Sequence, residues 1–108
     1  MKYIIKVFVL SLALVSASGH GATIKGFGLG LCESWTKYEN DGGSIKKANR
    51  SWVLGYMSGV NETDFVNKDI LKMRNKRALF GWIDNYCIEN PQKNIAQATK
   101  ALVYELNK

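Results

Sequence analysis

The first 22 residues carry the pattern of an export signal, and this pattern limits what the rest of the chain can fold into. Lys2 and Lys6 give a positive start, the uncharged apolar stretch 7–15 follows, and small residues dominate 16–22. Such a stretch is too short to span a membrane but matches the core of a secretory signal. The alternative, a buried helix of the folded domain, is disfavoured because the stretch has no capping residue and no amphipathic pattern.

Three peptide bonds in the small-residue region are candidate cleavage sites. Cleavage after Ala17 or Gly19 leaves small residues at the −3 and −1 positions, whereas cleavage after Ala22 places His20 at −3. The mature chain is therefore expected to begin between Ser18 and Thr23. No lipobox cysteine stands at the junction, so we expect a soluble bacterial protein of the periplasm.

Two cysteines, Cys32 and Cys87, remain in a folded part of about 90 residues. A core of this size is small, and oxidising compartments favour disulfides, so we expect one Cys32–Cys87 bond. Closing a loop of this length stabilises a fold by roughly 4 kcal/mol in the chain-entropy treatment. The alternatives are a reactive thiol and half of a metal site.

The absence of histidine from the folded part argues against most enzyme classes. His20 is the only histidine of the chain, and it lies in or beside the signal. A Ser-His-Asp triad, a His-Cys zinc site and a histidine base are therefore excluded. Paired carboxylates can hydrolyse glycosides, but no spacing singles out such a pair. We expect a protein that is not an enzyme, with no catalytic residues, metal or cofactor.

The spacing of apolar residues predicts an all-α fold of four helices in one domain, 23–108. The first helix carries Leu31, Cys32, Trp35 and Tyr38 and ends at 40–43, and the second starts from an N-cap at Ser44 and reaches about 60. The third spans 77–89. Asn90 as N-cap and Pro91 as first residue then predict a fourth helix that reaches the C-terminus. The stretch 64–73 allows one short additional helix.

Glycines and tryptophans suggest how these helices pack. Gly55 and Gly59 lie on one face of the second helix, so we expect close approach of a neighbouring helix there. Trp35, Trp52 and Trp82 fall one on each of the first three helices and are expected in the core. The glycine-rich segment 26–30 is expected to be a flexible lead-in.

One dense basic patch lies between the second and third helices. The full chain has fifteen Lys and Arg residues and nine Asp and Glu residues. Removal of Lys2 and Lys6 with the signal leaves thirteen basic residues and a net charge of about +4. The patch is either a solvated charged face or a docking surface for an anionic partner. For the second interpretation, the expected contact residues are Tyr56, Asn61, Asp64, Lys68, Lys72, Arg74, Lys76 and Arg77. Export and the lack of interleaved aromatic residues argue against nucleic acid as the partner.

The segment from Gly55 to Asn61, GYMSGVN, resembles the GY-x-x-G-V-N/D segment of the Tai-type immunity proteins of type VI secretion systems. Tyr86, the Asn-Pro-Gln-Lys sequence at 90–93 and the stretch 98–106 resemble that family's Pro-containing turn and closing helix. The resemblance covers roughly 50–106. It implies a protein that is not an enzyme and that neutralises an exported toxin or a cell-wall hydrolase by covering its active surface.

A second resemblance concerns layout more than motif. Two widely spaced cysteines, Cys32 and Cys87, and an Asn-Pro sequence before a terminal helix are similar to the HdeA/HdeB acid-stress chaperones of the periplasm. This resemblance implies acid-induced loosening of the fold and binding of unfolded proteins. We expect a specific binding or inhibitory protein, with the chaperone as the alternative. A phage- or plasmid-borne exclusion factor is a further interpretation, close to that of a binding protein.

The export signal makes a direct prediction about the isolated protein. In bacterial cells that express the full chain, the protein should accumulate in the periplasm with a mass that places its first residue between Ser18 and Thr23. Intact-mass spectrometry of the periplasmic fraction measures this. An uncleaved chain that stays in the cytoplasm would contradict it.

Overall fold

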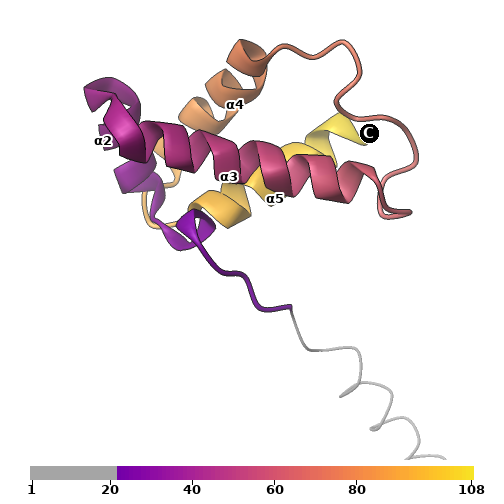
Figure 1. The fold of residues 1–108 in the computed structure, drawn as a ribbon, viewed down its shortest axis with the longest axis horizontal. Helices are drawn as coiled ribbons and strands as arrows, with labels where there is room; N and C mark the ends of the chain where they lie inside the picture. Colours follow the sequence, from indigo (N-terminus) through magenta and orange to yellow (C-terminus); the bar gives the residue numbers. More distant parts are fainter. Residues whose placement is uncertain (1–21) are drawn as a thin grey trace, which may run out of the picture.

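The computed structural model describes residues 22–108. The predicted export signal and its candidate cleavage sites fall in 1–22. Residues 1–21 of this segment lie outside the described residues. The described part contains the short 3₁₀ helix η1 (Phe27–Leu29) and the helices α2 (Cys32–Asp41), α3 (Gly43–Asn61), α4 (Lys76–Glu89) and α5 (Ile95–Leu106) (Figure 1). No strand occurs within 22–108, and the predicted all-α fold of four helices is confirmed.

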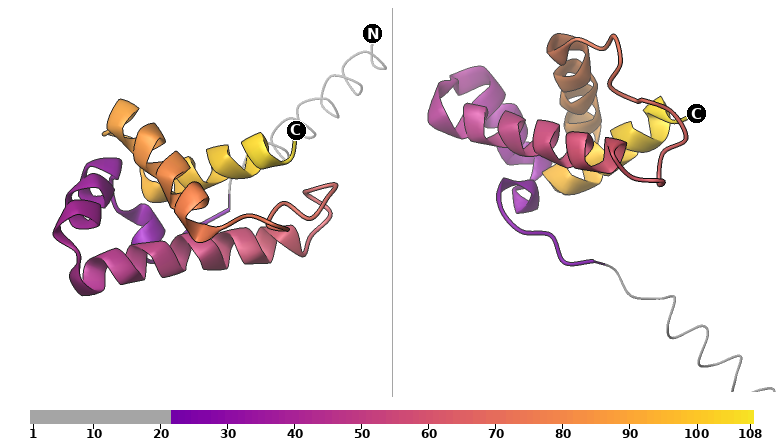
Figure 2. Two further views of the ribbon diagram at one scale, coloured as in Figure 1. Left: turned by 90° about the horizontal axis from the view of Figure 1, so that it is seen from above. Right: turned by 45° about the vertical axis from the view of Figure 1, so that its right-hand side comes forward.

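The long helix α3 forms one side of the molecule with α5 beside it, and α4 packs on α5 and α2 (Figure 2). Helix α2 contacts α3, α4 and α5, and η1 packs on α3 and α5. Together they enclose a single core. Its fully buried members include Trp35, Val53, Met57, Ile70, Ile83, Ala98 and Leu102. Of the three tryptophans, Trp35 is buried, whereas Trp52 and Trp82 are half-buried and pack on the edge of this core.

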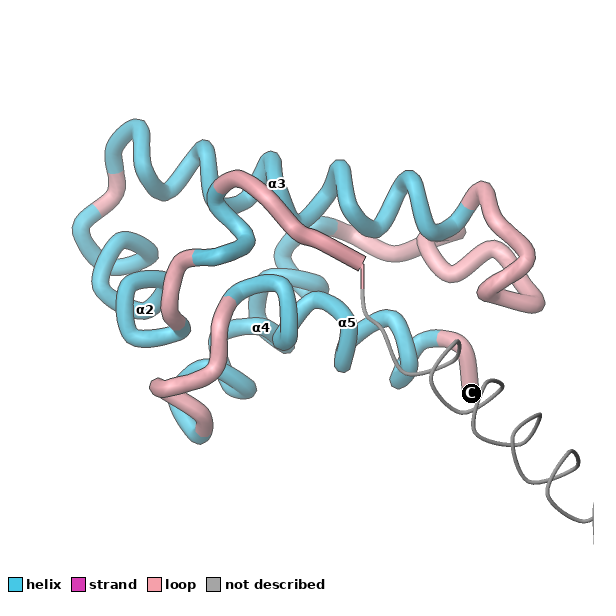
Figure 3. Tube along the Cα trace, turned by 90° about the horizontal axis from the view of Figure 1, so that it is seen from below, coloured by secondary structure: helices cyan, strands magenta, loops and turns pink. Residues whose placement is uncertain are grey.

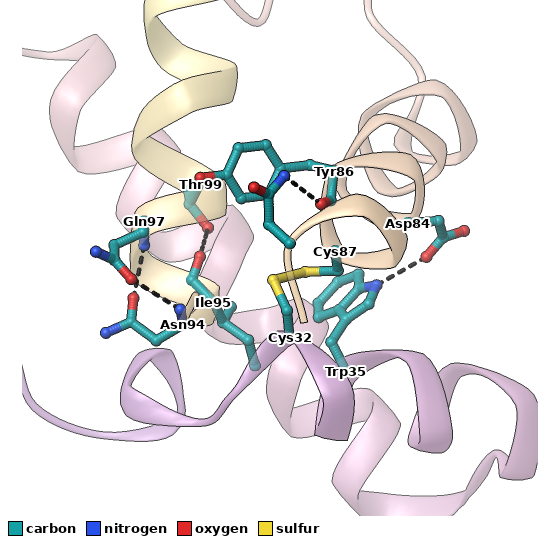
Figure 4. Close-up of a disulfide and its surroundings, with 10 residues drawn as sticks. Cys32, Trp35, Asp84, Tyr86, Cys87, Asn94, Ile95, Gln97 and Thr99 are labelled. Carbon is teal, nitrogen blue, oxygen red and sulfur yellow. Dashed lines mark hydrogen bonds between the residues drawn. A yellow bond between two sulfur atoms is a disulfide. The ribbon is translucent and has the colours of Figure 1, made fainter. Parts of the chain in front are cut away.

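The predicted disulfide joins the start of α2 to the last turn of α4 (Figure 4). The bond connects Cys32 to Cys87, and both side chains are buried. Beside it, the backbone N–H of Cys32 donates to the Lys93 carbonyl at 2.7 Å, and the N–H of Ile95 donates to the Gly30 carbonyl at 2.8 Å. The start of α2, the end of α4 and the start of α5 are therefore held at one junction.

Polar side chains add two further links between the helices. The indole Nε1 of Trp35 donates to Asp84 Oδ1 at 2.7 Å, which ties α2 to α4 (Figure 4). Arg50 of α3 donates to both carboxylate oxygens of Glu39 at 2.9 and 2.7 Å. Its guanidinium carbon also lies 4.4 Å from the ring centre of Phe80, so one side chain connects α3 with α2 and α4.

Two helices start at other residues than predicted. Helix α3 begins at Gly43 with Gly42 as its N-cap, so Ser44 is not the cap. Gly42 and Gly43 have φ angles of 79° and 85°, a backbone that favours glycine and that allows the sharp reversal after α2. Helix α5 begins at Ile95, four residues later than a start at Pro91.

The later start of α5 has a clear local cause. Asn94 and Gln97 form a complete capping box, in which each side chain bonds the other's backbone N–H, at 2.7 and 2.9 Å (Figure 4). Asn90 instead caps the end of α4, where its side chain donates to the Tyr86 carbonyl at 2.8 Å. Two Asn residues in one turn serve two different helix ends.

The glycine-rich segment 26–30 is ordered, not flexible. It forms η1, and Trp52 donates a hydrogen bond from its indole to the Lys25 carbonyl at 3.0 Å. Gly28 is buried under the same indole, and a Cβ atom there would lie 2.2 Å from Trp52 Cζ2. Glycine is required at this position because the indole packs directly on the backbone.

The expected close packing at Gly55 and Gly59 is wrong. Both glycines are exposed on α3, and apart from the neighbouring backbone of α3 itself, a Cβ atom at either would meet no atom of residues 22–108 within 4 Å. The apolar stripe of α3 faces the core through Val53 and Met57, and the two glycines lie outside it.

We therefore expect opposite effects from two Gly→Ala substitutions. Gly28→Ala should lower the free energy of unfolding by about 1–3 kcal/mol, because the new methyl group would overlap the Trp52 ring. Gly55→Ala should raise it by up to about 1 kcal/mol, because alanine stabilises an exposed helical position. Urea unfolding of both variants measures the difference, and a loss of stability in Gly55→Ala would contradict the exposed position of this glycine.

Candidate protein-binding surface

The longest connection between helices is the loop 62–75, which leads from α3 to α4. It leaves the end of α3, passes the end of α5 and returns to the start of α4 (Figures 1 and 3). The predicted short helix at 64–73 does not form, since the segment consists of turns and bends. Val66 and Ile70 are nevertheless buried, so the loop contributes to the core and is held against the helices.

A small polar network fixes the middle of the loop. Asn61 donates from its side-chain amide to Asp69 Oδ1 at 2.8 Å and accepts from the backbone N–H of Ile70 at 2.9 Å. Asp69 also accepts from the N–H of Leu71 at 3.2 Å. Side chains that bond the backbone in this way compete with helix formation, which explains the missing helix. Asn61, an expected contact residue, therefore has a structural role here.

The same network affects the ionisation of Asp69. The hydrogen bond from Asn61, followed by the backbone N–H of Leu71, lowers the pKa of the Asp69 carboxyl below its ordinary value. Lys72 lowers this pKa further through its charge. These groups stabilise the ionised carboxylate.

A second set of contacts ties the loop to the end of α5. The backbone N–H of Asn67 donates to Asn107 Oδ1 at 3.0 Å, and Lys68 donates to the main-chain oxygen of Lys108. Phe65 packs edge-on against Tyr104, with ring centres 5.6 Å apart. Lys68, which the sequence placed in the basic patch, thus donates a hydrogen bond to the backbone of Lys108.

At its second half the loop presents an exposed methionine among basic residues. Met73 is 96% exposed and has a φ angle of 59°, the left-handed region that bulky residues rarely adopt. The N–H of Arg74 donates to the Leu71 carbonyl at 3.2 Å and closes the turn that holds it. We call the exposed residues Lys72, Met73, Arg74, Lys76 and Arg77 the Met73 surface.

Two members of this surface are unfavourably placed for helix stability. Lys76 and Arg77 occupy the first turn of α4, where the helix dipole favours acidic side chains, and that turn contains none. Next to Lys76, a shallow hollow of about 340 Å³ is lined by Lys47 and Arg50 of α3 and by Phe80. The hollow extends the positive surface from α4 to α3. Lys47 was not predicted; its only signal was its position on the polar face of the second helix.

The structure separates the other expected contact residues from this surface. Tyr56 is half-buried and stacks on Trp52, with ring centres 5.3 Å apart, so it packs against the core. Asp64 is exposed in the first half of the loop. Of the eight expected contact residues, only Lys72, Arg74, Lys76 and Arg77 belong to the Met73 surface.

No protein-family model matches the chain, and neither a curated protein nor a solved structure shows significant similarity to it. Within residues 22–108, no group of three or more His, Cys, Asp or Glu side chains is arranged to hold a metal ion. Among the helices of that same part, none combines the length and the apolar character that crossing a membrane requires.

The lowered pKa of Asp69 predicts how its contribution depends on pH. The ionised carboxylate should stabilise the loop above the ordinary aspartate pKa of about 3.9, and this stabilisation should be lost as the pH falls through the lower pKa of the folded state. Asp69→Asn should therefore speed hydrogen exchange at the Ile70 and Leu71 amides at pH 7, with a smaller difference from wild type below pH 4.

Asp64→Asn is the matched control, because no hydrogen bond within 22–108 engages the Asp64 side chain. It should exchange like wild type at both pH values. Equal exchange in Asp69→Asn and wild type at pH 7 would show that the carboxylate does not hold the loop.

Proposed function

We propose that this protein is an exported binding protein that neutralises another protein by docking its Met73 surface onto an acidic region of that partner. The observation that carries this proposal is Met73 itself, an almost fully exposed apolar side chain on a left-handed backbone. Strained backbone of this kind persists only where the surrounding structure enforces it, and it is concentrated at functional positions.

The loop is suited to binding because it is fixed in advance. Buried Ile70 and the Asn61–Asp69 hydrogen bond hold the segment that leads into the turn, and the Asn75 side chain caps α4 directly after it at 2.8 Å. A preformed loop loses little conformational entropy when a partner binds. Methionine is flexible and polarisable, and therefore fits apolar pockets of irregular shape.

The charges around Met73 indicate the chemistry of the partner. Lys72, Arg74 and Arg77 would attract an acidic surface and speed the encounter, whereas Met73 would be buried on contact. A cell-wall hydrolase that uses paired carboxylates offers such an acidic cleft. This fits the toxin or hydrolase that the resemblance to immunity proteins implies.

A second candidate function, an acid-activated chaperone, is favoured by a different observation. Three carboxylates hold links within the fold: Glu39 with Arg50, Asp84 with Trp35, and Asp69 with Asn61. Among them, the pKa of Asp69 is lowered by the hydrogen bond from Asn61, so strong acid would remove the stabilisation that this carboxylate provides, while the Cys32–Cys87 bond would limit unfolding. Apolar surface would then become available for other unfolded proteins.

Charge reversal tests the proposed surface. A triple variant with Lys72→Glu, Arg74→Glu and Arg77→Glu should associate with the partner at least tenfold more slowly at low salt, and the difference should shrink as salt rises. Met73→Ala should instead raise the dissociation rate about tenfold, since it removes the buried anchor. The partner is isolated by pull-down from periplasmic extract, and both rates are measured on immobilised protein.

Lys93→Glu combined with Lys100→Glu is the matched control, because both lysines are exposed on other elements. It should leave the dissociation rate unchanged and slow association much less. Equal effects of the triple variant and this control would exclude the Met73 surface. Broad suppression of aggregation near pH 2–3, without a specific partner at pH 7, would favour the chaperone.

A further inference from the structure

A separate pocket lies between η1, α2 and the first half of α3. Its volume is about 470 Å³, and like the hollow beside Lys76 it is open to solvent. Phe27, Ile45 and Ile95 supply apolar walls, and Ser34, Tyr38 and Asn49 supply the polar side chains. No charged side chain lines it.

Asn49 is the unusual residue of this pocket. It is only 3% exposed, yet no hydrogen bond within residues 22–108 engages its side-chain amide. No buried side-chain nitrogen or oxygen atom of that part lacks a partner, so the small exposed area of Asn49 must include its amide atoms. Because Asn49 lines the pocket, the amide is accessible from the pocket.

The position of Asn49 in the sequence is unusual for a polar residue. It stands four residues after Ile45 and four before Val53, in the apolar stripe of α3. Because no buried side-chain nitrogen or oxygen atom of residues 22–108 lacks a partner, the amide is open to water in the pocket. A ligand in the pocket would replace that water and bond the amide directly.

We propose that this pocket binds a neutral, mainly apolar small molecule that carries one amide or a similar group able both to donate and to accept. Asn49 offers two N–H donors and one carbonyl acceptor, which such a group complements. The lack of charged lining disfavours ions, because no side chain that lines the pocket offers an opposite charge. This proposal is independent of the Met73 surface, which involves other residues.

The first test uses 3-phenylpropanamide as the probe and 3-phenylpropanoate, its anionic analogue, for comparison. NMR titration of the protein isolated from cells that express the full chain should show millimolar binding of the amide, with shifts at Ile45, Ile95 and the Asn49 side-chain amide. The carboxylate should bind at least tenfold more weakly. Shifts confined to other residues, or equal binding of both compounds, would overturn the proposal.

The second test substitutes Asn49→Leu, which keeps the approximate shape and removes the amide. It should weaken binding of 3-phenylpropanamide about tenfold, because the amide that bonds the ligand is lost, and it should keep the melting temperature of the free protein within a few degrees of wild type. A clearly lowered melting temperature with unchanged probe binding would indicate a structural asparagine and contradict a binding role.

Ile45→Trp provides a variant that does not depend on the packing around Asn49. Ile45 is 36% exposed at the pocket, so a larger side chain can be accommodated at the surface while it fills the pocket space. This variant should lose probe binding and keep the wild-type melting temperature within a few degrees. Asn85→Leu, at an exposed position of α4, is the matched control and should bind the probe like wild type.

Discussion

The junction around the Cys32–Cys87 bond determines how the other elements can be arranged. The bond joins the start of α2 to the end of α4, and the chain then has only a short turn before α5 begins. Backbone hydrogen bonds from Cys32 to Lys93 and from Ile95 to Gly30 hold this turn and the start of α5 beside the disulfide. A small domain with one compact core gains most from a crosslink that closes a long loop. The chain segment between the two cysteines contains all of α3, including its buried core residues Val53 and Met57.

Away from this junction, the chain is held by weaker and more varied contacts. Lys76, at the start of α4, lies eleven residues before Cys87, or roughly 16 Å along the helix. There the loop 62–75 depends on the buried side chain of Ile70 and on the amide and carboxylate of Asn61 and Asp69. Local stability in a protein follows the density of buried contacts. The Met73 surface is thus carried by a segment that Val66 and Ile70 anchor in the core and that side-chain hydrogen bonds hold in shape.

The helices could be predicted because their apolar pattern is repeated along the chain, and the disulfide because only one pairing is possible. Apolar residues recur along each helix, and two cysteines allow only one intramolecular pairing. The helix starts were harder, since Asn90 and Asn94 are both good caps and only the bond between Asn94 and Gln97 decides between them. Gly55 and Gly59 were misjudged because spacing alone does not tell which face of α3 meets a neighbour. Gly28, which does require glycine, depends on Trp52, 24 positions later.

The candidate sites were predicted only in part, for a related reason. Basic residues at 72–77 are visible in the sequence, but the left-handed backbone of Met73 belongs to a turn, closed by the Arg74 N–H and the Leu71 carbonyl, that no residue spacing indicates. Asn49 was missed, although a polar residue in the stripe of Ile45 and Val53 was a readable signal.

Met73, Lys76 and Asn49 share one property, which is that each contradicts the preference of its own position. Met73 has a left-handed backbone, Lys76 lies at the positive end of a helix, and Asn49 places an amide in the apolar stripe of α3. Sequences that fold well agree with local preferences, and exceptions concentrate where function requires them. Gly55 and Gly59 contradict helix preference as well, but outside their own helix backbone no atom of residues 22–108 would lie within 4 Å of a Cβ at either position. A locally unfavourable residue therefore indicates a site only where a second observation points to a ligand, as the exposed basic loop does for Met73 and the pocket does for Asn49.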